Sequence, residues 1–452
     1  MLVFLWWWGA WLSALANIFY DLWFDLVVVD KYQSEITDKL KKKWVKVVIW
    51  DDKFPYSKDD VIIYSDAVIH SKDFEKVKKN RKFTYFQFLG EISKRFDTIA
   101  IAWTHWKTST TSIFLSVAKD LIPNLWLGIL WGFVPDLWNK NYYLNKNVKS
   151  EIKEIFSKIL TAKWSRPANL FKKYYFVLEA DEFNRHFLLL DPYLSLITKV
   201  DHDHKDIYPT EKDYFDAFKL FVSKTRYKTL TNDGEFKWKV SKDVKFVDIN
   251  KDIEFDYIFW EHMKKNASLV LEWLKLLTKL NAKVILEKIR KFRWVWRRQE
   301  YLGKLKELKI YSDYAHHPVE IKATYEAFKK QFPDKNIYVI FQPHQLFRFV
   351  SYQKDFEDIL KQIDNLIIYD IYSVREEELL KQLWKKEGNI WTEDTNPKEV
   401  VKTIWKKISD KVWALYLDNF DNLLEYLYDK NWIVVLMTAW DLDYKIRKII
   451  IK

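Results

Sequence analysis

The sequence predicts an α/β fold built from three successive domains. Short apolar segments of strand length alternate with helical patterns along the whole chain, which is the order expected of mostly parallel sheets. The length of 452 residues suits two to four domains. A content of 49% hydrophobic and 31% charged residues is typical of a globular protein with sizeable cores.

The first domain is predicted at residues 1–96. A strand at 2–5, a turn and a helix from about Leu12 are followed by strands at 26–29, 45–49 and 61–64. The uncharged first 20 residues also resemble a membrane anchor. The segment lacks the basic flank of a signal peptide, and Asp21 and Asp25 follow at once. We reject the membrane interpretation because a strand, a turn with glycine in place of Trp6, Trp8 and Trp11, and a helix explain the same spacing.

The central domain is predicted at residues 97–300 and the third at 301–452. The central domain has strands at 98–102, 175–178 and 194–200 and a helix around 267–280, and the third has strands at 308–311, 337–341, 365–369 and 433–437. We expect a central domain of the P-loop ATPase type, with a mostly parallel sheet, between two Rossmann-like domains.

Tryptophan stands where a phosphate-binding loop needs glycine. In the segment 101–111, IAWTHWKTSTT, a Lys-Thr pair follows an apolar strand and precedes a helix, which is the core of such a loop. The loop works because bare backbone N–H groups surround phosphate oxygens at a helix N-terminus, an approach that glycine permits without strain. An indole at Trp103 or Trp106 would fill the space that the phosphate needs.

The composition extends this observation to the whole chain. It contains 24 Trp and 7 Gly, whereas a glycine content of about 7% predicts roughly 32 glycines. Adding the tryptophans to the glycines recovers that expectation. We therefore hypothesise that most of the tryptophans stand for glycines, encoded by UGA codons that were translated under the wrong genetic code. The alternative is a protein that is truly rich in tryptophan.

The central loop and the acidic segments after it predict an ATP site. Lys107 would reach the β- and γ-phosphates and the Thr108 hydroxyl would bind Mg²⁺, although Ile101 occupies the first glycine position of the general pattern. Carboxylates of the segment 179–182, EADE, are natural Mg²⁺ ligands at a strand end. The segment 201–204, DHDH, could bind zinc, but its context favours a second hard-metal site with His204 as one ligand.

Further turns after strands predict other binding positions. With glycine at 6, 8 and 11 the segment WWWGAW reads G-x-G-G-x-G, a turn that presents N–H groups to a diphosphate, and Asp30 could meet a ribose hydroxyl. An arginine of the segment 296–298 could contact ATP phosphate. The segments 313–318, DYAHHP, and 342–348, QPHQLFR, follow strands, where open parallel sheets bind ligands; each alone also fits a loop cap.

Taken in order, these motifs resemble those of the Mur ligases over nearly the whole chain. The family motifs GIGGIGMSALA, GTHGKTxTT, EADE, NIxADHxDxY, GxHNxxN, FxGxxRR, DDYxHHPxE, FQPHxxxR and GAGD match segments that begin at residues 6, 103, 179, 199, 260, 292, 312, 341 and 438. Family glycines fall on Trp6, Trp8, Trp11, Trp103, Trp106, Trp260, Trp294 and Trp440. Met263, Ser312 and Thr438 depart from the motifs.

The resemblance implies an ATP- and Mg²⁺-dependent ligase that joins L-alanine to the lactyl carboxylate of UDP-N-acetylmuramate in peptidoglycan precursor synthesis. It implies catalytic roles for Lys107, Glu179, His204 and Arg348, with Thr108, Glu179 and His204 on metal. The implied ATP contacts are Trp103, Thr104, His105, Trp106, Lys107, Thr108, Ser109, Asn266, Arg298 and Asp313. The implied UDP-sugar contacts are Trp8, Gly9, Ala10, Trp11, Ser13 and Asp30. The implied amino-acid contacts are His316, His344 and Arg348.

Three alternatives remain at this point. A related recycling ligase attaches a tripeptide to the same sugar nucleotide, although the FQPH motif argues against it. A non-catalytic protein that binds a sugar nucleotide is the better interpretation if the tryptophans are real. The net charge of +12 could indicate nucleic-acid binding, but lysines and acidic residues are mixed along the chain. We expect no nucleic-acid or membrane partner, a monomer or homodimer, and, with no cysteine, a cytoplasmic location.

Overall fold

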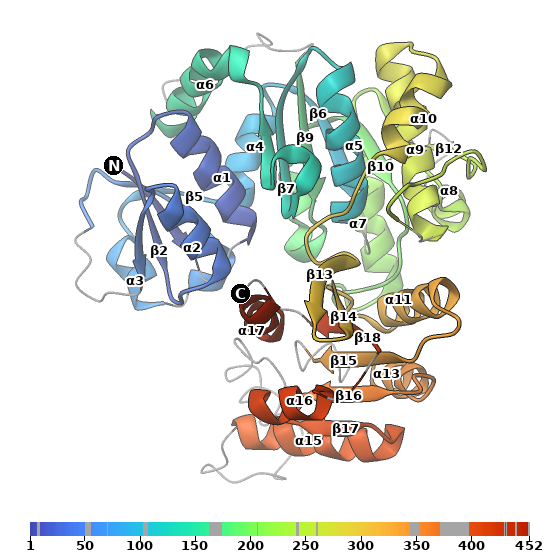
Figure 1. Ribbon diagram of the computed structural model, residues 1–452. Coiled ribbons are helices and arrows are strands. Elements are labelled where there is room, and N and C mark those ends of the chain that lie inside the picture. Colours follow the sequence, from blue (N-terminus) through green and yellow to red (C-terminus); the bar gives the residue numbers. More distant parts are fainter. Residues whose placement is uncertain are drawn as a thin grey trace. The chain divides into compact units, whose positions relative to one another are not determined.

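Three β-sheets and the helices that cover them make up the molecule (Figure 1). The computed structural model describes residues 1–6, 10–49, 56–69, 71–102, 107–161, 174–205, 207–240, 244–258, 261–343, 352–370, 397–428, 430, 432–438 and 441–450. The chain divides into two compact units, Met1–Val295 and Trp296–Lys452. The first unit holds two sheets and the second unit holds one, so the predicted α/β class is confirmed.

The first sheet is parallel throughout and has the strand order β3-β2-β1-β4-β5. This is the order of a Rossmann-type sheet, with the all-apolar and fully buried β1 at its centre. Its strands are β1 Leu2–Trp6, β2 Leu26–Asp30, β3 Lys46–Ile49, β4 Val61–Tyr64 and β5 Arg81–Thr84. Its helices are α1 Ala10–Asp21, α2 Glu35–Lys42, the short η1 Asp66–Val68, α3 Lys72–Lys76 and α4 Tyr85–Ser93.

The second sheet has the order β12-β11-β10-β6-β9-β7-β8, and only the β7–β8 pair is antiparallel. Its strands are β6 Asp97–Ala102, β7 Leu125–Val134, β8 Lys140–Leu144, β9 Tyr175–Ala180, β10 Pro192–Ile197, β11 Lys228–Thr231 and β12 Val244–Phe246. Its helices are α5 Lys107–Leu121, η2 Pro135–Leu137, η3 Lys146–Val148, α6 Lys149–Thr161, η5 Phe183–Leu189, α7 Glu211–Ser223, α8 Gly234–Val240, α9 Glu261–Thr278 and α10 Ala282–Arg290. The central position of β6 places the start of α5 at the middle of the sheet edge.

The third sheet has the order β13-β14-β18-β15-β16-β17 and is parallel except at β13–β14. Its strands are β13 Glu300–Leu305, β14 Leu308–Asp313, β15 Ile337–Gln342, β16 Leu366–Tyr369, β17 Leu415–Leu417 and β18 Ile433–Thr438. Its helices are α11 Pro318–Gln331, α13 Gln353–Leu360, α15 Pro397–Val412, α16 Phe420–Leu427 and α17 Asp441–Ile450. The three sheets begin at residues 2, 97 and 300, and the domain boundaries at 96 and 300 stay a prediction.

Helix α1 joins the first sheet to the second. It packs against β1 and β2 on one side and against β7 and β8 on the other. The Asp21 carboxylate at its C-terminal end accepts a hydrogen bond from the Tyr142 hydroxyl at 2.7 Å and pairs with the Lys140 ammonium at 3.2 Å. The Asp21 carbonyl also accepts from Lys149 at 2.9 Å. The C-terminal end of α1 is therefore bonded directly to β8 and to the start of α6.

Four tryptophans end helices in the left-handed conformation that favours glycine. Trp23, Trp44, Trp138 and Trp413 have φ between 57° and 65°. In each case the tryptophan N–H donates a hydrogen bond to the carbonyl three residues earlier, and the N–H of the next residue donates to the carbonyl five residues before it. At Trp44, for example, the acceptors are the carbonyls of Lys41 and Leu40. These two hydrogen bonds define the Schellman motif, a helix ending in which glycine is strongly enriched. The indoles contact little, since Trp413 is 95% and Trp44 90% exposed.

We expect Trp413→Gly to raise the free energy of unfolding of the second unit by about 1 kcal/mol, because a non-glycine residue pays roughly that amount in the left-handed region. Trp413→Ala removes the same indole but keeps the Cβ, so it should gain less. Urea denaturation of the parent and the two variants measures the difference. Equal stability of the glycine and alanine variants would contradict this account.

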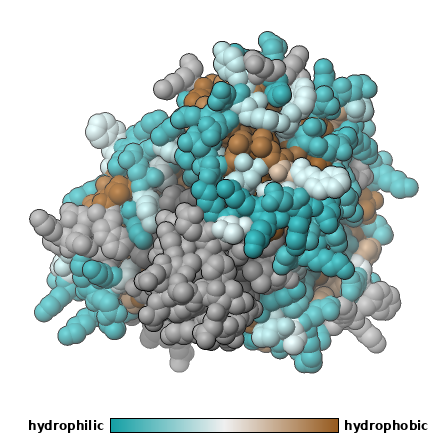
Figure 2. Space-filling model, turned by 90° about the horizontal axis from the view of Figure 1, so that it is seen from below, coloured by the Kyte–Doolittle hydropathy of each residue, from teal (hydrophilic) through white to brown (hydrophobic). Residues whose placement is uncertain are grey.

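On the face shown in Figure 2, hydrophilic residues cover most of the coloured surface and hydrophobic residues form separate groups. Among the described residues, no helix is both long and apolar enough to cross a membrane.

Candidate active site

The N-terminus of α5 carries the predicted phosphate-binding lysine. Strand β6 is buried along its whole length, and α5 begins at Lys107, five residues after β6 ends. The predicted contacts Trp103, Thr104, His105 and Trp106 lie outside the described residues. The predicted strand and the predicted helix on either side of residues 103–106 are therefore present. Backbone N–H groups at such a helix N-terminus can bind anions.

Lys107 lies between two carboxylates of the segment after β9. Its ammonium pairs with Asp181 at 3.3 Å and also with Glu182, which is almost fully buried. Burial alone would lower the pKa of Lys107, but the charges of Glu182 and Asp181 outweigh it and raise the pKa above its usual value. The pKa of Asp181 falls to about 2, because Lys107 and His186 outweigh the effect of burial. Lys107 therefore stays charged at all ordinary pH values.

Thr108 and Glu179 form a pair of hard oxygen ligands. The Thr108 hydroxyl donates to Glu179 Oε2 at 3.0 Å, and the backbone N–H of Trp131 on β7 donates to Oε1 at 2.7 Å. No three His, Asp or Glu side chains in the described part of the chain are arranged to hold a metal ion alone. The Thr108–Glu179 pair fits Mg²⁺ only if phosphate and water supply the remaining ligands, which is the usual protein environment of Mg²⁺.

Two further hydroxyls on the first turn of α5 lack a partner. Ser109 Oγ and Thr110 Oγ1 are buried and make no hydrogen bond to any described residue. An unsatisfied buried hydroxyl costs free energy unless a ligand or water completes it. Ser109 was predicted to contact ATP, and its unsatisfied hydroxyl at a helix N-terminus fits a polyphosphate.

His204 lies beside Glu182, one of the carboxylates that Lys107 contacts. Its Nε2 is 3.6 Å from Glu182 Oε1 and 3.9 Å from Asp203 Oδ2. The residue itself has φ of 53°, and its ring contacts the edge of Phe183. The structure thus brings Lys107, Glu179 and His204 to one edge of the sheet, where Glu182 is shared by Lys107 and His204.

The N-terminal turn shows how tryptophan changes the predicted sugar-nucleotide site. The Trp6 indole is fully buried and donates to Asp30 Oδ2 at 2.6 Å, which engages the carboxylate expected to meet a ribose. The half-buried Trp11 packs against Tyr85 and Phe86 of α4. The buried Ser13 accepts from Asn141 Nδ2 on β8 at 2.9 Å. Trp8 and Gly9 lie outside the described residues, and of Ala10 only the backbone is described, at the start of α1.

Asn266, expected on the adenine side, is buried in α9. Its side-chain amide reaches the Met263 sulfur at 4.0 Å. Helix α9 packs against α5, so Asn266 belongs to the same unit as Lys107. Its contact with the nucleotide stays a prediction.

Two adjacent arginines of the second unit, Arg297 and Arg298, have different surroundings. Arg297 pairs with the buried Asp443 at 2.9 Å, next to Arg447, so it belongs to an internal ion network. Arg298, by contrast, has buried Nε and Nη1 atoms with no hydrogen-bond partner among the described residues. Unsatisfied guanidinium donors fit an anion such as phosphate, which supports Arg298 as the ligand-binding member of the pair.

Asp313 ends β14 and is almost fully buried. Its carboxylate accepts from the backbone N–H groups of Gln299 at 2.9 Å and Ala315 at 2.8 Å. Burial raises the pKa of Asp313 to about 7, although the charge of Arg298 opposes the rise.

This raised pKa predicts a pH-dependent stability of the second unit. Because folded Asp313 keeps its proton up to about pH 7 and the unfolded residue loses it near pH 4, stability should fall as the pH rises through that interval, by at most about 4 kcal/mol. Asp313→Asn should weaken this dependence of the free energy of unfolding on pH. Asp355→Asn, on the exposed side of α13, should leave the dependence unchanged. Urea denaturation at pH 5 and pH 8 measures both slopes, and an unchanged slope in Asp313→Asn would refute the assignment.

The predicted amino-acid contacts are only partly described. His316 Nδ1 lies 2.8 Å from the Tyr314 carbonyl and 3.1 Å from Glu320, so the ring is held at the start of α11. His344 and Arg348 lie outside the described residues. Their roles stay predictions.

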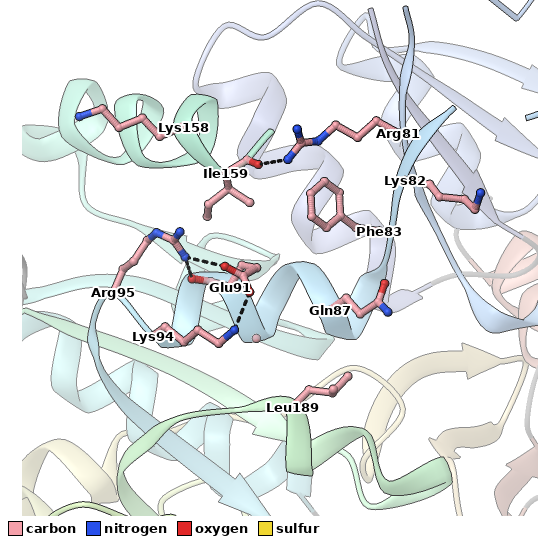
Figure 3. Close-up of a pocket in the computed structure, with 11 residues that line it drawn as sticks. Arg81, Lys82, Phe83, Gln87, Glu91, Lys94, Arg95, Lys158, Ile159 and Leu189 are labelled. Atoms are coloured by element: carbon pink, nitrogen blue, oxygen red, sulfur yellow. Dashed lines mark hydrogen bonds and ion pairs between the residues drawn. The ribbon is translucent and has the colours of Figure 1, made fainter. Parts of the chain in front are cut away.

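A cavity of about 460 Å³ lies along α4 (Figure 3). Its cations are engaged with the protein itself. Lys94 and Arg95 pair with Glu91, and Arg81 donates to the Ile159 carbonyl at 2.9 Å. The Arg81–Ile159 bond joins β5 to α6, whereas the two ion pairs of Glu91 lie within the C-terminal end of α4. No predicted site residue lines it.

Comparisons with known proteins agree with this fold. Residues 297–415 match the family described as Mur ligase, glutamate ligase domain. The UDP-N-acetylmuramate–L-alanine ligase of Lactobacillus helveticus is 28% identical over 473 residues, which cover 96% of this chain and 94% of that protein. The ligase of the same name from Lactobacillus acidophilus is 27% identical, with the same coverage of both chains.

Solved structures share the whole architecture. The UDP-N-acetylmuramate-alanine ligase of Thermotoga maritima superimposes with a TM-score of 0.75 at 18% identity, covering 99% of this chain and 97% of that one. A murein peptide ligase of Psychrobacter arcticus has a TM-score of 0.64 at 16% identity, covering 96% and 95%. At these identities the likeness concerns the fold.

The fold and the site place a lysine at the N-terminus of a helix, beside carboxylates that follow the neighbouring strand of a parallel sheet. Residues 297–415 match a Mur ligase domain, and UDP-N-acetylmuramate–L-alanine ligases resemble the chain along nearly its whole length, which is the resemblance that its motifs predicted.

Proposed function

We propose that this chain joins L-alanine to UDP-N-acetylmuramate at the expense of ATP, in peptidoglycan precursor synthesis in the cytoplasm. The lactyl carboxylate attacks the γ-phosphorus of ATP, which forms an acyl phosphate and releases ADP. The amine of L-alanine then attacks the acyl carbon, loses a proton and expels inorganic phosphate. The relatives that match this chain along its length carry the name of that reaction, which supports alanine as the amino acid.

The observation that carries the proposal is the position of Lys107. Both reactants of the first step are anions, so the enzyme must supply positive charge where the γ-phosphate meets the carboxylate. Lys107 is always charged, begins a helix and lies next to the Thr108–Glu179 pair. Thr108 and Glu179 would hold Mg²⁺, which neutralises phosphate charge when bound.

The remaining roles extend the proposal to residues that only the motifs identify. His204 would hold a second Mg²⁺, and Arg348 would clamp the alanine carboxylate with His316 and His344 nearby. Arg298 would contact ATP phosphate and Asp313 its ribose. The buried unsatisfied guanidinium of Arg298 supports its role.

The test uses two versions of the full chain. One is the chain as written, and the other, called the glycine version below, carries glycine at the eight tryptophan positions that match family glycines. We expect the glycine version to release phosphate only when ATP, UDP-N-acetylmuramate and L-alanine are all present, and mass spectrometry should detect the amide product. Release that requires a tripeptide in place of L-alanine would identify the recycling reaction. No release from either version would overturn the proposal.

A further inference from the structure

One histidine outside every predicted motif role bridges the first two sheets at the active site. His186 on η5 places Nε2 at 2.6 Å from Asp66 Oδ2 and Nδ1 at 3.5 Å from Asp181 Oδ2. Asp66 lies on η1, directly after β4 of the first sheet, whereas Asp181 follows β9 of the second. A single imidazole thus connects carboxylates that belong to different sheets.

The ring is fixed in place by its surroundings. It stacks on Phe86, the second residue of α4, with ring centroids 4.0 Å apart and planes inclined by 15°. Phe183 meets it edge-on. Burial alone would lower the pKa of His186, but the hydrogen bonds and charges of Asp181 and Asp66 outweigh it and raise the pKa to about 9. The doubly protonated ring has an N–H for each carboxylate.

The connection continues to the phosphate-binding lysine. Asp181 uses Oδ2 toward His186 and Oδ1 toward Lys107, at 3.3 Å. A displacement of Asp66 therefore reaches the Lys107 ammonium through two side chains, His186 and Asp181. Lys107 is the group that must leave its carboxylates to meet incoming phosphate, so the position of Asp181 affects how readily it does so.

We propose that His186 is a positioning residue that couples binding of the sugar nucleotide on the first sheet to binding of ATP at Lys107. The inference rests on the proposed function and on the motif resemblance, which implies sugar-nucleotide contacts on the first sheet and ATP contacts at the start of α5. It predicts that each ligand strengthens the binding of the other, since coupling between sites is reciprocal. Without His186 the two sites would bind their ligands independently.

The test measures this coupling directly in the glycine version. Calorimetry gives the Kd of a non-hydrolysable ATP analogue with and without saturating UDP-N-acetylmuramate. We expect the sugar nucleotide to lower this Kd about tenfold in the parent, within the usual range of coupling, and less than twofold in His186→Gln and Asp66→Asn. Asp59→Asn, the same change at an exposed position of the first domain, should keep the full effect.

The double variant separates coupling from local damage. If His186 and Asp66 act as one unit, Asp66→Asn adds nothing to the lost coupling in His186→Gln. Thermal unfolding shows whether each variant is folded. Variants that melt at the same temperature as the parent are used to test the inference. Coupling that survives in folded His186→Gln would overturn it. Absence of L-alanine-dependent phosphate release in the parent would instead count against the proposed function.

Discussion

Lys107→Ala in the glycine version is expected to lower kcat for ADP formation by at least about 10³-fold, the scale of losing one charged stabiliser of phosphoryl transfer. The structure gives the physical reason. Lys107 is the first residue of α5, and its ammonium pairs with Asp181 and Glu182. When phosphate is present, the same charge offsets the repulsion between the phosphate and the attacking carboxylate.

Two further variants serve as controls for Lys107→Ala. Lys119→Ala removes a lysine near the other end of α5, where the ammonium pairs with Asp120, and should leave turnover unchanged. Lys107→Arg keeps the charge but changes its geometry, and should recover only part of the activity. Substantial turnover by Lys107→Ala would remove this lysine from the mechanism.

Replacing the eight tryptophans by glycine is expected to strengthen ATP binding by at least about 100-fold, because a blocked phosphate loop loses its backbone contacts altogether. A second gain is expected at the sugar-nucleotide site, where the Trp6 indole no longer engages Asp30. Equilibrium dialysis with ATP compares the two versions. Trp413→Gly alone provides the control. It removes the left-handed tryptophan at one helix end but leaves the ATP site and the sugar-nucleotide site unchanged.

The natural protein offers a separate test of the codon hypothesis. Peptides that span residues 103–107 and 410–414, isolated from the source and sequenced by mass spectrometry, should contain glycine at 103, 106 and 413. The left-handed helix ends at Trp23, Trp44, Trp138 and Trp413 extend the hypothesis beyond the family motifs, because none of these four positions belongs to one. Tryptophan in both peptides would contradict it.

Local patterns were sufficient to predict much of the fold and the centre of the site. Strand β6 and helix α5 lie where the apolar run and the Lys-Thr pair placed them. Thr108 and Glu179 meet because β6 and β9 are parallel neighbours, whose carboxyl ends share one edge. The sequence also holds a signal at helix ends. Glycine is expected just after the last residues of a helix, and Trp44 stands in that position after Lys43.

Other features depend on contacts that no local pattern contains. The ten buried residues of β7 are continuously apolar, and such a run does not distinguish a strand from a buried helix. The antiparallel β7–β8 pair was therefore not predicted. Asp66 and His186 are 120 residues apart, and each stands in an ordinary turn sequence. Their meeting follows from how α1 and α4 pack the first sheet against the second.

The bonds of Asp21 at the end of α1 bear on the mechanics of the enzyme. Swinging the first sheet away from the second would break the Asp21–Tyr142 bond, the Arg81–Ile159 bond and the Asp66–His186 bond together. All three bonds lie within the unit Met1–Val295. The two N-terminal sheets are therefore fastened to each other at three separate points, so a force that separates them must break these bonds together.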